Sequence, residues 1–237
     1  SLRQLCAPGN LKAGSANMIR ILENWKRKQG EDRPVMIFIN VSGGGLRSGT
    51  FVMNSLQHLD SMTRGKLMQH TMLISGASGG MLAATYYREL YRRQLSDSSV
   101  NRNDPRYTDN IANDLLNPLF SSMVARDIFS PAQKFQVGEY SYVKDRGYAF
   151  EQKLDRNAGH LLGGQLKEYI SDEQQARIPL MIFNSTIAQD GRRMMISTQP
   201  LRFMMKPAKD AGDTATSPDA VDFASYFAKQ DPLNVRL

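Results

Sequence analysis

The sequence is poor in the residues that join a protein covalently or through metal ions. It contains one cysteine, Cys6, so no disulfide can form within the chain. Its three histidines lie far apart, at His58, His70 and His160, and no cysteine–histidine spacing typical of a zinc site is present. We therefore expect neither a disulfide framework nor a metal centre.

A long apolar run is also missing. No stretch approaches the roughly 20 residues that a helix needs to cross a bilayer. The first residues, SLRQLCAPGNLKAG, lack the charged region, apolar block and cleavage site of a signal peptide. We expect a chain without a transmembrane segment or signal peptide, located in the cytoplasm or at a membrane surface.

The charge of the chain is basic but dispersed. The 237 residues carry a formal net charge of +7, with lysines and arginines in short clusters rather than in a long arm. This pattern does not predict a nucleic-acid partner. A basic surface would assist contact with anionic membranes, and an ordinary solvated surface explains the charge equally well. With 41% hydrophobic residues, the chain is expected to fold as one domain over residues 1–237.

Strand and helix signals alternate along the first hundred residues. Residues 14–28 have apolar side chains at helical spacing, and the run RPVMIFINV at 33–41 is typical of a strand buried on both faces. A helix is expected from about Ser48, a second buried strand over 71–76 and a long helix over 79–94. This order predicts parallel strands joined by right-handed crossovers, and so an α/β fold.

Later segments add to this core. Residues 110–170 are expected to form a mostly helical, irregular insertion that caps the sheet. Asp190-Gly191 lies between two apolar runs, and this pair is favoured in two-residue hairpin turns. The sequence therefore predicts an antiparallel hairpin added to the sheet, followed by a polar linker and a short helix near 220–230.

A motif with catalytic character lies between the second strand and the helix that follows it. The segment ISGASGG places Gly76, Ser78 and Gly80 in the pattern G-x-S-x-G, which at such a junction is typical of a nucleophile elbow. The turn exposes the serine hydroxyl at the head of a helix, whose N-terminal amides favour developing negative charge. We interpret Ser78 as a nucleophile; a Gly/Ser turn that only caps a buried helix is the alternative.

A second glycine-rich segment, VSGGGLRSGTF, follows the first strand. Gly43, Gly44 and Gly45 can present backbone amides to an oxyanion without side chains in the way, and Arg47 could add positive charge or lock the loop. The alternative is a dinucleotide-phosphate loop. It is disfavoured because Ser48 replaces the third glycine or alanine and no acidic residue closes a second strand about 20 residues later. The segment is predicted to be an oxyanion loop.

The base that would activate Ser78 is not evident. Elbow enzymes of the α/β-hydrolase type carry Ser, then Asp or Glu, then His along the chain, and His160 is the only histidine after Ser78. It lies in the glycine-flanked stretch DRNAGHLLGG of the expected cap, which indicates a surface position. The sequence therefore favours a serine activated by a carboxylate alone.

These motifs resemble those of the patatin-like and cytosolic phospholipase A2 superfamily of lipid acyl hydrolases. SGGGLRSGTF and SGASGG are similar to its oxyanion loop and its elbow, and FNSTIAQDGRRMMIST is similar to a hairpin before its last motif. The resemblance covers roughly residues 34–200. It implies a three-layer α/β/α sandwich, Ser78 as the nucleophile, an oxyanion loop of Gly43, Gly44, Gly45 and Arg47, no cofactor, and a lipid or other ester as substrate.

The sequence departs from this family at the catalytic aspartate. The family carries the aspartate of a Ser-Asp dyad in a D-G-G or D-G-A motif, whereas Arg192 follows Asp190-Gly191 here. We expect Asp190 to be a turn residue rather than the base, and the catalytic aspartate to lie beyond Leu237. The chain is then C-terminally truncated and weakly active or inactive on its own. The competing function is a catalytically inactive ligand- or lipid-surface-binding module of the same fold.

Overall fold

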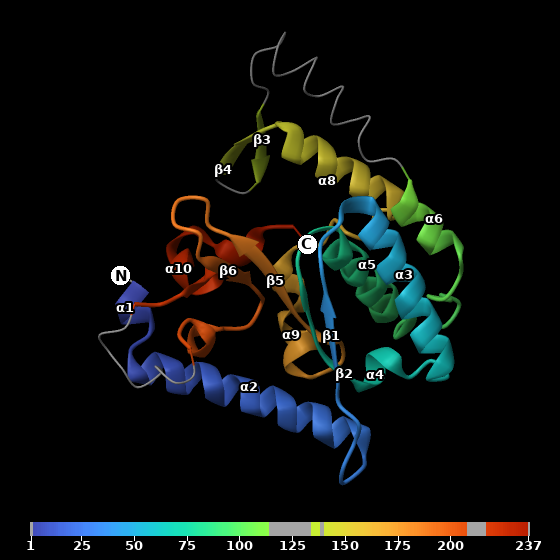
Figure 1. Cartoon of the computed structure of the whole chain (residues 1–237), viewed down its shortest axis with the longest axis horizontal. Helices are drawn as coiled ribbons and strands as arrows, with labels where there is room; N and C mark the ends of the chain where they lie inside the picture. Colours follow the sequence, from blue (N-terminus) through green and yellow to red (C-terminus); the bar gives the residue numbers. More distant parts are fainter. Residues whose placement is uncertain (1, 114–133, 138–139, 208–216, 237) are drawn as a thin grey trace.

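A computed structural model describes residues 2–113, 134–137, 140–207 and 217–236, which form a mixed α/β fold (Figure 1). The α-helices are α1 (Leu2–Leu5), α2 (Pro8–Gln29), α3 (Gly45–Met62), α4 (Leu67–His70), α5 (Ser78–Gln94), α6 (Arg106–Ala112), α8 (Arg146–Asn157), α9 (Ile170–Gln174) and α10 (Phe223–Tyr226). Short 3-10 helices are η2 (Leu166–Tyr169), η3 (Arg202–Met204), η5 (Ala228–Gln230) and η6 (Pro232–Asn234). The strands are β1 (Ile37–Val41), β2 (Thr71–Gly76), β3 (Lys134–Val137), β4 (Tyr140–Val143), β5 (Leu180–Thr186), β6 (Arg193–Ile196) and β7 (Ala220–Asp222).

The main sheet has the strand order β1-β2-β5-β6-β7 and is mostly parallel. β1, β2 and β5 run in the same direction, with Val41 opposite Gly76 and Gly76 opposite Phe183. β6 pairs antiparallel with β5 and parallel with β7. The carboxyl ends of β1 and β2 therefore lie side by side, and α3 and α5 begin there. The predicted α/β fold with a mostly parallel sheet and an added hairpin is confirmed.

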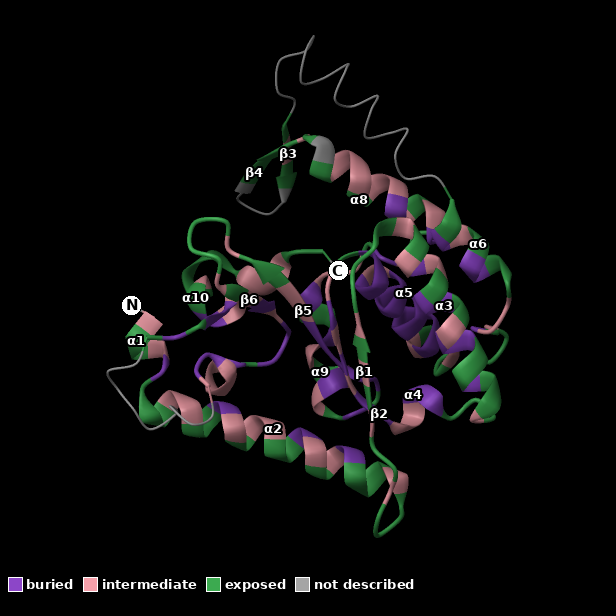
Figure 2. Ribbon diagram, in the orientation of Figure 1, coloured by how far each residue is buried: buried purple, intermediate pink, exposed green. Residues whose placement is uncertain are grey.

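Helices cover both faces of this sheet, as Figure 1 shows. Alternate residues of β5 point to opposite faces: Met181 joins the core beneath α3 and α5, whereas Leu180 packs with Ile21 and Trp25 of α2. In Figure 2 the buried residues concentrate in α5 and the central strands, and the outer surfaces of α2 and α3 are exposed. The period-two pattern of β5 thus separates the apolar core into two layers.

The expected positions of β2 and α5 are confirmed, but the expectation for β1 is wrong. In the described part of the chain β1 is an edge strand, and its residues alternate between partly buried and exposed. Phe38 remains 61% exposed, because α2 packs against β2 and β5 rather than over β1. The continuous apolar run reflected strand propensity in a strand that is covered on one face only.

The insertion at 110–170 contains a pair of strands in addition to the helices that the sequence indicated. Its described residues include α6 and α8, but also the antiparallel pair β3–β4, and residues 114–133 lie outside the described residues. Phe135 packs against Tyr142 and Tyr148, with ring centroids 5.6 Å and 4.6 Å away. α8 begins after Asp145, whose carboxylate caps the helix by accepting a hydrogen bond from the Tyr148 amide (3.0 Å).

A buried ion pair joins α5 to α9. The Arg88 guanidinium donates to the Glu173 carboxylate, and both side chains are at most 1% exposed. Arg88 also donates to the carbonyl of Pro179 (3.2 Å) and lies over the Tyr169 ring, 4.9 Å from its centroid. Glu173 accepts a second bond from the Thr198 hydroxyl. The pair therefore connects three segments that are distant in sequence: α5, the segment from α9 to Pro179, and the residues around Thr198.

No helix in the described ranges combines the length and the apolar character that crossing a bilayer requires.

Candidate active site

Ser78 occupies a sharp turn between β2 and α5. β2 ends at Gly76, Ala77 is extended (φ −146°, ψ 157°), and α5 begins at Ser78 itself. Ser78 has a φ of +57°, in the left-handed region that costs a non-glycine residue roughly 1–2 kcal/mol. The G-x-S-x-G pattern thus occupies a strained strand-to-helix turn over residues 76–80, which we call the elbow.

The glycines of the elbow make room for the glycine-rich loop. Methyl groups built on them would overlap loop carbonyl oxygens, at 2.2 Å for Gly76 and Val41, 2.0 Å for Gly79 and Gly45, and 2.3 Å for Gly80 and Ser42. The overlapping atoms are backbone atoms, which cannot move aside as a flexible side chain does. The two glycine-rich segments therefore form one structural unit, in which residues 41–45 lie directly on the elbow.

Gly43 faces the side chain of Ser78. A methyl group on Gly43 would lie 3.1 Å from the Cβ and 3.4 Å from the Oγ of Ser78. Because α5 begins at Ser78, the first amides of this helix, including that of Gly79, have no intrahelical acceptors, and the helix dipole adds positive potential there. The loop and the head of α5 therefore meet at one hydroxyl group.

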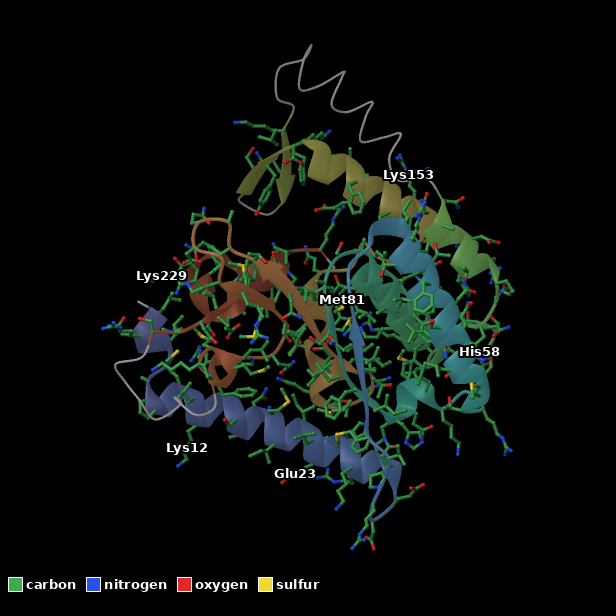
Figure 3. The ribbon with its side chains drawn as sticks, viewed as in Figure 1. Lys12, Glu23, His58, Met81, Lys153 and Lys229 are labelled. Carbon is green, nitrogen blue, oxygen red and sulfur yellow. The ribbon has the colours of Figure 1, made fainter. Side chains whose placement is uncertain are left out.

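A cavity of about 500 Å³ opens at Ser78. Its apolar walls come from five elements: Leu46 of α3, Met81 and Leu82 of α5, Ile111 of α6, Phe150 and Leu154 of α8, and Phe183 of β5. In Figure 3 Met81 lies in the interior, whereas Lys12, Glu23 and His58 lie at the periphery. Among the described lining residues, the polar side chains are Ser78 and Asn184 alone. The cavity therefore suits an apolar ligand, with the polar side chains of Ser78 and Asn184 at its wall.

The structure brings only some of the sequence-predicted residues to Ser78. Gly43 and Gly45 contact the elbow, whereas Arg47 is exposed in the first turn of α3, beside an adjoining depression that Phe51 also lines. His160 follows α8 and is exposed; its Nδ1 lies 3.0 Å from the Oδ2 of Asp155, a residue of α8. None of the described residues that line the cavity carries a carboxylate, imidazole or guanidinium.

Asp190 lies in the loop between β5 and β6, whose antiparallel pairing confirms the predicted hairpin. A backbone hydrogen bond from Ile187 to Arg192 (2.9 Å) closes this loop, so it is longer than the two-residue turn that Asp-Gly indicated. The Asp190 carboxylate accepts hydrogen bonds from the Arg192 side chain (2.7 Å) and amide (3.1 Å). These bonds hold the pKa of Asp190 below its usual value, which weakens it as a base.

Sequence reasoning missed the two elements that complete the cavity. Phe150 and Leu154 project into it from α8, about seventy residues after the elbow. Their i, i+4 spacing is typical of one face of an amphipathic helix and does not by itself identify a cavity. Asn184 directly follows the apolar residues 180–183 of β5 and forms hydrogen bonds next to the elbow. An amide side chain at the carboxyl end of an apolar strand was the available signal, because ligands of parallel sheets bind at the carboxyl ends of the strands.

Comparison with known proteins gives limited similarity. No protein-family model matches the sequence, and no curated protein matches it. Among solved structures, the chain is similar to human GIVD cytosolic phospholipase A2 in complex with methyl gamma-linolenyl fluorophosphonate, at 16% identity and a TM-score of 0.46. It is also similar to that enzyme with the same inhibitor and terbium chloride, at 15% identity and a TM-score of 0.41. Each match covers 78% of this chain and 27% or 28% of the other. The chain thus spans about a quarter of those structures, and similarity at this level assigns neither substrate nor reaction.

Proposed function

We propose that the protein is a serine hydrolase that cleaves carboxylic esters of lipids, in the manner of a phospholipase A or a lipase. The observation that carries this proposal is the geometry of Ser78, which keeps a φ of +57° at the head of α5 and at the wall of an apolar cavity. Such backbone strain persists only where the surrounding structure enforces it, and it is concentrated at functional sites.

The proposed reaction is acyl transfer through Ser78. The hydroxyl oxygen attacks the ester carbonyl carbon while a base takes its proton, and the carbonyl oxygen becomes an oxyanion. Amides of the Gly43–Gly45 loop and of Gly79 would stabilise this charge. Collapse of the intermediate expels the alcohol, which takes the proton. Water then attacks the acyl-enzyme, releasing the fatty acid and restoring Ser78.

The lining of the cavity favours an acyl chain as the bound part of the substrate. Burying apolar groups contributes about 0.8 kcal/mol per methylene, and the walls that Leu46, Met81, Phe150 and Phe183 provide offer no competing hydrogen bonds from their side chains. Arg47 keeps a proposed role as positive charge near the mouth, because its helix begins at Gly45, which lines the cavity.

The proton acceptor is proposed to be an aspartate other than Asp190. The resemblance implies a Ser-Asp dyad, and Asp190 is hydrogen-bonded to Arg192 in an exposed loop. A second candidate function follows from the same observation: a lipid-binding module with the same cavity but without turnover. Ester hydrolysis by the full-length natural protein, measured on short-chain and phospholipid substrates, separates the two.

Gly43→Ala is expected to impair Ser78 selectively. The added methyl group would lie 3.1 Å from the Ser78 Cβ, and a displacement of about 1 Å at a reacting group can cost about 100-fold in rate. We expect labelling by a fluorophosphonate probe to slow by about 10- to 100-fold, with a nearly unchanged Tm. Gly9→Ala is the matched control, since its methyl group meets nothing within 4 Å. Equal labelling of both variants would contradict the assignment of Gly43.

Asp190→Asn is expected to change ester turnover less than about two-fold. Its carboxylate serves the hairpin loop through Arg192, whereas loss of a catalytic base typically costs about 10²–10⁴-fold. Asp97→Asn is the matched control, because Asp97 is likewise an exposed aspartate that binds a neighbour two residues away, Ser99. A fall in turnover beyond tenfold in Asp190→Asn alone would make Asp190 the base.

A further inference from the structure

Asn184 forms hydrogen bonds at the point where β2 turns into the elbow. From β5 its Nδ2 donates to the Ser75 hydroxyl oxygen (3.0 Å) and to the Gly76 carbonyl (3.2 Å), with a longer contact to the Ile182 carbonyl (3.4 Å). The same side chain lines the cavity at Ser78. It is therefore a polar group that touches both the elbow and the space where a substrate would lie.

The chemistry of its partners determines the orientation of this amide. The carbonyl oxygens of Gly76 and Ile182 can only accept hydrogen bonds, so the group that faces them must be the NH₂. A flipped amide would place two oxygens against each other. Nδ2 is thus committed to the elbow, and Oδ1 is directed away from these carbonyls.

Two bonds clamp the peptide group between Gly76 and Ala77. On one side the Ala77 amide donates to the Val41 carbonyl of β1 (3.3 Å). On the other side the Gly76 carbonyl accepts from Asn184 of β5. The last register pair between β2 and β5 is Gly76 with Phe183, so the side chain continues the bonding to β5 where the strand pairing ends. This is the last peptide group but one before Ser78.

We propose that Asn184 is a positioning residue for Ser78. By holding the Gly76–Ala77 peptide plane against β1, it fixes the direction in which the chain enters the left-handed turn at Ser78, and with it the aim of the hydroxyl and of the Gly79 amide. A rigid supporting contact of this kind matters because catalytic groups need placement within fractions of an ångström. The inference rests on the proposed hydrolase function and adds a residue to it.

The test uses two substitutions of Asn184 in the full-length protein. Asn184→Leu keeps the approximate size and removes the donor; we expect kcat for ester hydrolysis to fall about 10- to 100-fold with KM changed less than about three-fold. Asn184→Asp places a carboxylate against the Gly76 carbonyl. Its rate relative to wild type should rise as the pH is lowered, because the protonated carboxyl group can donate again. The described residues that line the cavity include no other carboxyl or imidazole group, so a pH dependence found only in Asn184→Asp is assigned to position 184.

Asn24→Leu is the matched control. Asn24 also donates from Nδ2 to a backbone carbonyl, that of Gln174 (2.8 Å), and lines no part of the cavity. Amide hydrogen exchange supplies a readout that does not depend on activity: Ala77 should exchange faster in Asn184→Leu than in Asn24→Leu or wild type. Unchanged exchange at Ala77, or an unchanged kcat, would overturn the positioning role. Absence of ester turnover in the wild-type protein would instead overturn the hydrolase function, and turnover that survives in Ser78→Ala would overturn the role of Ser78 as the nucleophile.

Discussion

Ser78→Ala is expected to abolish ester hydrolysis by the full-length protein, with a loss of about 10⁴-fold or more. The substitution removes the only atom proposed to form the acyl-enzyme bond, and loss of a nucleophile from a cooperative catalytic unit can cost about 10⁶-fold. The strained φ of +57° at position 78 remains in the variant, because the packing of residues 41–45 on the elbow imposes it. The fold is therefore expected to persist.

The measurement is ester turnover together with covalent labelling by a fluorophosphonate probe, followed by mass spectrometry of the labelled peptide. Ser61→Ala is the matched control: Ser61 is also a helical serine, on α3, and its hydroxyl donates only to the Gln57 carbonyl (2.9 Å). Wild type and Ser61→Ala should react equally at Ser78. Undiminished labelling or turnover in Ser78→Ala would remove the nucleophile assignment.

Glu173→Gln is expected to cause the largest loss of stability, about 3–5 kcal/mol in the free energy of unfolding. The substitution leaves the Arg88 guanidinium buried without its counter-charge. Two further nitrogens of Arg88, Nε and Nη2, already lack hydrogen-bond partners, and the remaining contacts of its guanidinium with the Pro179 carbonyl and the Tyr169 ring carry no full negative charge. For a chain of this size the midpoint of thermal unfolding should fall by roughly 10–15 °C.

Two comparisons separate this effect from general sensitivity of the region. Arg177→Gln breaks the ion pair with Asp172 (3.6 Å), in which Arg177 is 58% exposed, and should cost less than about 1 kcal/mol. The double substitution of Arg88→Met and Glu173→Leu should be less damaging than Glu173→Gln alone, because it leaves no buried charge. Denaturant unfolding monitored by circular dichroism measures all three. A loss below 1 kcal/mol in Glu173→Gln would refute a role of the pair in stability.

The local features of the candidate site could be predicted from the sequence because their causes are local. G-x-S-x-G between an apolar strand and an amphipathic helix permits few backbone paths, and Ser78 has the backbone conformation that this pattern predicts. Asp190-Gly191 likewise predicted a hairpin, since these residues favour tight turns. The length of that loop was wrong because the ends of β5 and β6 are set by their pairing across the sheet.

Tertiary structure alone decided how these parts combine. The apolar run at 37–41 has the composition of a central strand, but which strands border it depends on sheet order, so the exposure of Phe38 could not be foreseen. The elbow glycines are required because the loop at 41–45 packs on them, a contact that joins distant segments. Phe150 and Asn184 reach the cavity from α8 and β5 for the same reason. Residue type and spacing determined the turns and helices; long-range packing determined which side chains share the cavity with Ser78.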